Sequence, residues 1–154
     1  MMPILAEPLR NTLEMVADLA APAADPWWII ASAAVALHGA PVSDVRDVDL
    51  LMSEPDARRT LVRAGAEPRS DQGSNKFRSA VFGTWLGASL PVEIFGGFEF
   101  AGFGGWKHVL PETREPIAVG DKTLFVPSTA ELRAMLIGFG RPKDLARAEL
   151  LHSP

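Results

Sequence analysis

The stretch RDVDLLM, residues 46–52, places two aspartates at the start of an otherwise apolar run. Its valine, leucines and methionine favour a β-strand. Residues two apart on a strand point to the same face, so Asp47 and Asp49 should lie together while Val48 points into the core. Two like charges held together repel unless a cation lies between them, and Mg²⁺ prefers such oxygen ligands. The pattern predicts a metal-binding pair, although two solvated acids at a strand end have the same spacing.

The residues before this run predict a strand, a turn and a helix. WWII, residues 27–30, is apolar, aromatic and β-branched, which predicts a buried central strand. ASAAVALHG, residues 31–39, is rich in alanine and ends in glycine, which predicts a short helix that stops at Gly39. The backbone N–H groups and the Ser32 hydroxyl at its start would favour phosphate. The alternative is that Ser32 only caps the helix.

The rest of the chain shows four further helices and a β-rich middle. Apolar residues at helical spacing predict a helix over residues 9–21, and the segment from Glu54 to about Ala64 predicts another, ended by Gly65. The segments expected to form strands are KFRSAVFGTW, LPVEIFGG and a hairpin made of PIAVG and KTLFVPS.

Two helices are predicted at the C-terminal end. Ser128 is expected to cap the first, with Glu131 completing an S-x-x-E capping box. GFGRPKD, residues 138–144, interrupts the pattern, and a last helix is expected to run through Leu151.

The segment FGGFEFAGFGGW, residues 95–106, is rich in glycine and phenylalanine. One interpretation is a movable lid whose aromatic rings stack a nucleobase. The other is a tight pair of strands with core phenylalanines at positions 95, 98, 100 and 103. We favour the pair of strands.

The composition fits one globular domain over residues 1–154, with 47% hydrophobic residues. Cysteine is absent, which excludes disulfides, thiolate zinc sites and a cysteine nucleophile. The net charge of -4 argues against nonspecific coating of nucleic acid. The most apolar stretch, residues 27–37, is too short to cross a bilayer, and no signal peptide pattern precedes it, so we expect no membrane association and a cytoplasmic location.

Taken together, the strand-turn-helix of residues 27–39, Arg46 and Asp47-Val48-Asp49 resemble the nucleotidyltransferase superfamily, specifically its small bacterial branch with AbiEii-type toxins and aminoglycoside-type minimal transferases. The resemblance implies an α+β fold, with a mixed β-sheet flanked by helices and a C-terminal helical tail. The family's third carboxylate, on a later strand, is matched by Glu93 in PVEIF. A solvated strand residue is the alternative for Glu93.

The resemblance also implies a mechanism and its cofactor. Asp47, Asp49 and Glu93 would hold Mg²⁺, and Glu93 would deprotonate the hydroxyl that attacks a nucleoside triphosphate (NTP). The turn at Ala31 and Ser32 would bind the triphosphate.

Arg46 or Lys143 would add a positive contact to the phosphates. Without the resemblance, Arg46 fits a solvent-facing residue and Lys143 fits a residue that only marks the start of the last helix. The acceptor of the nucleotide would be a small molecule, a protein hydroxyl or an RNA end.

One position departs from the family pattern. Ala31 stands where the family has its first glycine, and a methyl group at this tight turn would obstruct the approach of the backbone to the triphosphate. The alternative function is therefore a weak or inactive module on the same scaffold that binds or regulates, including a toxin with an antitoxin partner.

Overall fold

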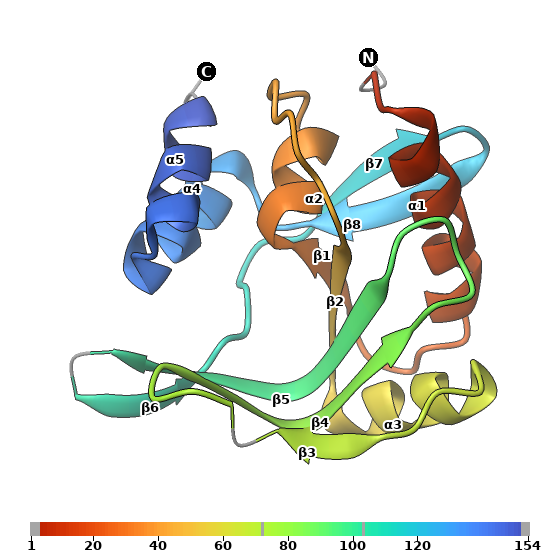
Figure 1. Ribbon diagram of the computed structural model, residues 1–154, viewed down its shortest axis with the longest axis horizontal. Coiled ribbons are helices and arrows are strands. Elements are labelled where there is room, and N and C mark those ends of the chain that lie inside the picture. The colour runs from red at the N-terminus through yellow and green to blue at the C-terminus, as the bar shows by residue number, and fades with distance from the viewer. Residues whose placement is uncertain (1–3, 72, 103, 152–154) are drawn as a thin grey trace.

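The computed structural model describes residues 4–71, 73–102 and 104–151. Figure 1 shows a strongly bent sheet with α2, α4 and α5 on one side of it and α3 against its opposite side. None of the helices described has the length and apolar character needed to cross a membrane. The elements, in chain order, are α1 (Glu7–Ala20), β1 (Trp28–Ile30), α2 (Ala31–Leu37), β2 (Val48–Met52), α3 (Glu54–Arg63), β3 (Arg69–Asp71), β4 (Phe77–Trp85), β5 (Val92–Gly102), β6 (Gly105–His108), β7 (Glu115–Val119), β8 (Lys122–Val126), α4 (Thr129–Phe139) and α5 (Pro142–Leu150).

The larger sheet has the order β1-β2-β5-β4-β3, with β6 paired to β5. Strands β2 and β5 are parallel and the other pairs are antiparallel, which confirms the expected mixed sheet. The predicted hairpin, β7 and β8, forms a separate two-stranded sheet. The central position predicted for WWII is wrong, because β1 lies at the end of the strand order. All three of its residues are nevertheless buried, since β8 packs beside it.

The two faces of β2 serve different purposes. Val48, Leu50 and Met52 point into the main core, which they share with α1, α2 and α3. Leu51 points the other way, into a second cluster, and Asp49 lies on the same face as Leu51 because residues two apart on a strand share a face. The buried residues of this second cluster are Trp28, Ile30, Leu51, Phe98 and Phe139. The sequence prediction that Val48 points into the core is confirmed.

Two adjacent glycines explain the bend of β5. A Cβ on Gly96 would lie 2.6 Å from the Ala57 Cβ, so only glycine lets α3 pack this close to the strand. Gly97 has φ +61°, which breaks the alternation of side chains. Phe95 and Phe98 therefore meet on one side, with ring centroids 5.2 Å apart, although they are three positions apart.

The pair of strands expected in residues 95–106 is confirmed as β5 and β6. Phe98 is buried, and Phe95 and Phe100 pack partly buried against the same cluster. Phe103, the fourth phenylalanine of that prediction, lies outside the described residues. The pattern did not indicate β3, whose residues are polar and mostly exposed.

The capping box predicted at α4 is only half correct. The Ser128 hydroxyl accepts a hydrogen bond from the Glu131 backbone N–H at 3.1 Å, as expected. The Glu131 carboxylate instead accepts from the backbone N–H groups of Glu112 and Thr113, both at 2.8 Å. These donors belong to the loop that precedes β7, so Glu131 holds that loop against the start of α4.

A buried aspartate of α3 forms hydrogen bonds with the loop that precedes β1. Asp56 is 2% exposed, and its carboxylate accepts from the backbone N–H groups of Ala24 and Asp25, at 3.1 and 2.8 Å, and from Arg59 at 2.7 Å. Burial alone would raise the pKa of Asp56, but these hydrogen bonds outweigh it and hold the pKa below its usual value. The ionised carboxylate therefore stabilises the fold.

We expect Asp56→Asn to lower the free energy of unfolding by about 2 kcal/mol at neutral pH. Because the pKa of Asp56 is lowered on folding, its contribution is present above the unfolded-state value near 3.8 and is lost as the pH falls through the folded-state value. Urea denaturation at neutral and at strongly acidic pH measures both effects. The exposed Asp121→Asn serves as the control. An equal loss at both pH values would contradict the assigned role.

Candidate active site

The site is built around Asp49, whose neighbours come from three separate parts of the chain. In the sheet, Asp49 of β2 pairs with Ile30 of β1 on one side and with Glu93 of β5 on the other. Paired residues on adjacent strands point to the same face, so Asp49 and Glu93 lie side by side. Ile30 is the last residue of β1, and the turn at Ala31 follows it directly.

The backbone of Ala31 has a strained conformation. Its φ of +60° is the only positive φ of a non-glycine residue in the part of the chain that the structure describes. Ser32 follows in the first turn of α2, is 3% exposed and lines a cleft. The N-cap position belongs to Ile30, whose side chain makes no capping hydrogen bond. Ser32 therefore does not act as the cap, which was the alternative interpretation of this residue.

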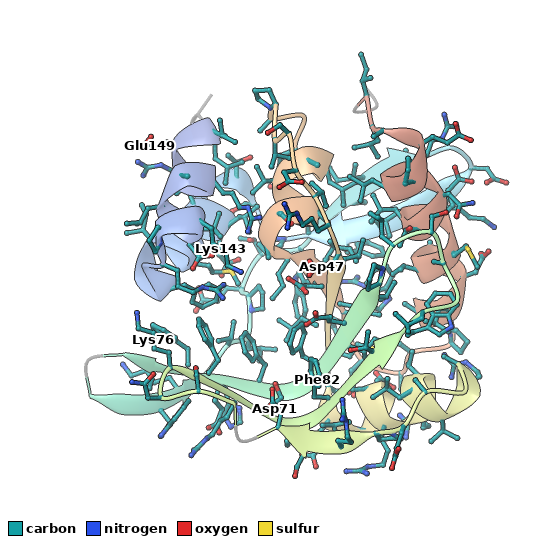
Figure 2. All side chains as sticks on the ribbon, in the orientation of Figure 1. Asp47, Asp71, Lys76, Phe82, Lys143 and Glu149 are labelled. Atoms are coloured by element: carbon teal, nitrogen blue, oxygen red, sulfur yellow. The ribbon has the colours of Figure 1, made fainter. Side chains whose placement is uncertain are left out.

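The cleft has a volume of about 540 Å³ and lies between the sheet and the helices α2 and α5. Figure 2 shows Lys143 at the helix α5, Asp47 next to the start of β2, and Asp71 on the strand β3. The carboxylates that line it are Asp44, Asp47, Asp49, Asp71 and Glu93. The cations that line it are Arg46, Arg78, Arg141, Lys143 and Arg147. The volume and the mixture of charges suit a charged organic ligand.

The electrostatics single out Asp49. Burial, reinforced by the charges of Asp47 and Glu93, raises the pKa of Asp49 from 3.8 to about 8. Lys143 and Arg141 act in the opposite direction, but by less. A carboxylate in this position holds its charge poorly unless a cation joins it.

Two solved structures have a similar fold. A proposed nucleotidyltransferase from Thermotoga maritima superposes with a TM-score of 0.69 at 21% sequence identity, over 82% of this chain and 81% of its own. The antibiotic-resistance factor ANT(2'')-Ia superposes with a TM-score of 0.57 at 10% identity, over 92% of this chain and 83% of its own. The chain has the nucleotidyltransferase fold. No protein-family model and no curated protein matches the sequence, so the likeness is one of fold.

Within this nucleotidyltransferase fold, Glu93 is not a solvated strand residue. It lines the cleft, and burial, followed by the charge of Asp47, raises its pKa above the usual value. Lys143 lowers the pKa of Glu93, and Asp71 raises it slightly. Glu93 thus pairs with Asp49 in the sheet and is affected by the charges of Asp47 and Lys143, and its role as a metal ligand or base stays a prediction.

The donors in the cleft fit a hard divalent cation in kind, since Asp47 and Asp49 offer only oxygen. Among the described residues, no group of three or more acidic or histidine side chains forms a closed metal site. Mg²⁺ is commonly held by one or two carboxylates together with substrate phosphates and water. The pair therefore fits a metal ion whose remaining ligands are oxygens of phosphate or water.

The two predicted phosphate contacts differ. The Arg46 side chain is 82% exposed, lies at the rim of the cleft and pairs with Asp44 at 3.1 Å. Lys143, in the first turn of α5, lines the cleft and influences both Asp49 and Glu93. The structure favours the solvent-facing interpretation of Arg46 and places Lys143 at the site.

Several lining residues were missed by sequence reasoning. Arg147 lies one helical turn after Lys143, so the spacing in PKDLAR was a usable signal. Asp71 ends a strand of only three residues in a polar stretch, which gave no signal. Phe77 and Phe139 meet through tertiary packing, with ring centroids 5.2 Å apart, and no local pattern shows this.

We expect Ala31→Gly to be tolerated and to improve nucleotide binding. A left-handed conformation costs alanine about 1–2 kcal/mol relative to glycine, while the greater freedom of unfolded glycine offsets about 0.5–1 kcal/mol. Thermal denaturation should therefore show equal or higher stability. Removal of the methyl group from the cleft should lower the Kd for Mg²⁺ and NTP, which calorimetry measures. Loss of stability by more than about 1 kcal/mol would contradict the strained turn.

Proposed function

We propose that the protein transfers a nucleoside monophosphate from an NTP to a hydroxyl-bearing acceptor in a Mg²⁺-dependent reaction. One observation carries the proposal. Asp49 is flanked in register by the turn that leads into Ser32 and by Glu93, and Lys143 lines the same cleft and lowers the pKa of both carboxylates. This combines a metal-binding pair, a phosphate-binding turn and a basic group around one point.

The residues of the helical side would hold the nucleotide. The Ser32 hydroxyl and the backbone that follows Ala31 would donate to phosphate oxygens, and Lys143 would pair with their charge. Asp47 and Asp49, with Glu93 as the third ligand assigned from sequence, would hold Mg²⁺. Bound there, Mg²⁺ would offset the charge that develops on the transferring phosphoryl group.

Glu93 would also act on the acceptor. The acceptor oxygen attacks the α-phosphorus, the bond from that phosphorus to the oxygen bridging to the β-phosphate breaks, and pyrophosphate leaves with the bonding electrons. Glu93 takes the proton of the attacking hydroxyl, since its raised pKa makes it a better base than an ordinary carboxylate. The protein needs little covalent chemistry of its own, because positioning and charge stabilisation drive such transfers.

Label transfer from NTPs tests the proposal. The protein is incubated with Mg²⁺, α-phosphate-labelled NTPs and acceptors that include small polyols, proteins and RNA, and pyrophosphate release is followed in parallel. We expect labelled acceptor and equimolar pyrophosphate, both abolished by EDTA and by Asp47→Asn. Asp121→Asn, at an exposed position that does not line the cleft, is the matched control and should retain activity. Label transfer that persists in Asp47→Asn would contradict the assignment of Asp47 as a ligand of Mg²⁺.

The second candidate function is a module that binds or regulates without turnover, and the methyl group of Ala31 at φ +60° favours it. Calorimetry separates the two candidates in part. Absence of Mg²⁺ and NTP binding would support the inactive module, whereas tight binding would support the transferase. Membership of the AbiEii-like branch and a toxin role with an antitoxin partner stay predictions of the sequence resemblance, which growth arrest on expression would test.

A further inference from the structure

Beyond Glu93, the cleft continues along β5 into a part that is lined by aromatic rings. Phe95 follows Glu93 on the same face of the strand, about 7 Å further along it. The bend of β5 brings Phe98 to this face as well, with the two ring centroids 5.2 Å apart. Phe77 of β4 and Phe139 of α4 complete the lining, with ring centroids 5.8 and 6.3 Å from that of Phe98. We call these four residues the aromatic part of the cleft.

A buried hydroxyl group lies within the aromatic part of the cleft. Ser79 of β4 is 4% exposed and pairs in the sheet with Phe98. Its hydroxyl makes no hydrogen bond with any residue that the structure describes. Among the described residues, every polar side-chain atom that is fully closed off from solvent has a partner, so the Ser79 oxygen keeps some accessible surface. Because Ser79 lines the cleft, this surface faces the cleft.

An unpaired hydroxyl among phenylalanine rings is unfavourable for the protein alone. A buried polar group without a partner loses its hydration and gains nothing in return, whereas alanine at the same position would carry no such cost. Ligand sites, in contrast, combine apolar and aromatic walls with a few polar groups that fix the orientation of the ligand. Ser79 and the rings around it have this composition.

We propose that the aromatic part of the cleft binds the nucleobase of the NTP, and that Ser79 selects among bases through a hydrogen bond to the edge of the base. This inference rests on the proposed transfer function and adds a specificity-determining residue to it. A nucleobase has two π faces that stack on aromatic side chains, and its hydrogen-bonding groups lie at its edge. The rings would contact the base, and the hydroxyl would donate to or accept from one group of that edge.

The aromatic part adjoins the place proposed for the triphosphate. Ile30, the residue before the turn at Ala31, belongs to the same apolar cluster as Phe98 and Phe139. Phe139 ends α4, and Lys143 lies in the first turn of the next helix, α5. Figure 1 shows α4 and α5 opposite the later part of β5. A base attached to a triphosphate between the turn and Lys143 would therefore meet the aromatic part of the cleft.

Calorimetry with matched ligands tests the inference. Non-hydrolysable analogues of ATP, GTP, CTP and UTP are each titrated into the protein with Mg²⁺, as is ribose 5-triphosphate, which lacks a base. We expect at least one NTP analogue to bind about tenfold or more tightly than ribose 5-triphosphate, because its base contacts the rings. The affinities of the analogues should span about fivefold or more, because a base whose edge does not match leaves the buried hydroxyl unpaired.

Ser79→Ala should remove most of the difference among the bases. It should leave the midpoint of thermal unfolding unchanged or higher, because it removes a hydroxyl that has no partner among the described residues. A serine with a purely structural role would instead lower the midpoint and leave the base preference intact. The matched control is Ser70→Ala, since Ser70 is exposed on the neighbouring strand β3 and does not line the cleft. This control should alter neither quantity.

The outcomes separate this inference from the transfer function. Equal affinities for the NTP analogues and ribose 5-triphosphate, equal affinities among the analogues, or a base preference that persists in Ser79→Ala would overturn the inference. Label transfer to an acceptor would still support the transfer function in those cases. Base-selective binding that depends on Ser79, without label transfer, would support the inference and count against the transfer function alone. No binding of any of these ligands would overturn both.

Discussion

Asp49→Asn is expected to abolish nucleotidyl transfer and, in the absence of metal, to stabilise the fold. Burial between Asp47 and Glu93 raises the pKa of Asp49 to about 8, above its value of 3.8 in an unfolded chain. The folded protein therefore binds more protons than the unfolded one between these values, and its stability falls as the pH rises through this window. Asparagine mimics the protonated form and removes that cost.

The expected gain in unfolding free energy is on the order of 2 to 4 kcal/mol at neutral pH, and it should vanish below the unfolded-state pKa of Asp49. In the presence of Mg²⁺ and NTP the wild type should be more stable than the variant, because these ligands stabilise only the wild type. Transfer should fall by at least about a thousandfold.

Denaturation across pH, with and without Mg²⁺ and NTP, together with pyrophosphate release, measures all three effects. Asp121→Asn is the control, because that carboxylate is exposed and does not line the cleft. A variant that is less stable than the wild type without metal would show that Asp49 has a structural role instead.

Replacement of Asp144 should have the second largest effect, on stability and binding together. Asp144 is 0% exposed, and its carboxylate accepts from the Arg141 side chain at 2.6 and 3.1 Å. The Arg141 guanidinium in turn lies 4.8 Å from the centroid of the Phe77 ring. Asp144 thus links the start of α5, which carries Lys143, to the aromatic cluster on the sheet.

We expect Asp144→Ala to cost about 3–5 kcal/mol, because it leaves the Arg141 charge without its partner. The KM for NTP should rise by about tenfold or more, since Lys143 is no longer held in place. Denaturation and initial rates measure the two effects, and Glu149→Ala, exposed on the same helix, is the control. An unchanged KM in a destabilised variant would show that Asp144 stabilises the fold but does not affect NTP binding.

The local part of the site was predictable from sequence. RDVDLLM indicated a strand with Val48 inward, and the alanine-rich segment after WWII indicated the helix that carries Ser32. The departure at Ala31 was also visible, and its φ of +60° shows why glycine suits that turn. The strand, the helix start and the turn depend on residues that are adjacent in the chain, so a sequence pattern can indicate them.

The contacts of the site between segments far apart in the chain were not predictable from local patterns. The parallel pairing that places Glu93 beside Asp49 joins segments more than forty residues apart, and only the family resemblance pointed to it. No local pattern pointed to Asp71, because β3 becomes a strand by pairing with β4. Likewise, WWII has the pattern of a central strand but owes its burial to β8, which no local periodicity reveals.

The most direct test is a crystal structure with Mg²⁺ and a non-hydrolysable NTP. We predict a metal ion bound by Asp47 and Asp49 and by phosphate oxygens, with the triphosphate between Ser32 and Lys143. The same crystals should show Glu93 facing the α-phosphorus. A nucleotide bound elsewhere, or a triphosphate in the cleft without contact to Asp49 or its metal, would contradict the proposal that this cleft is a nucleotidyl transfer site.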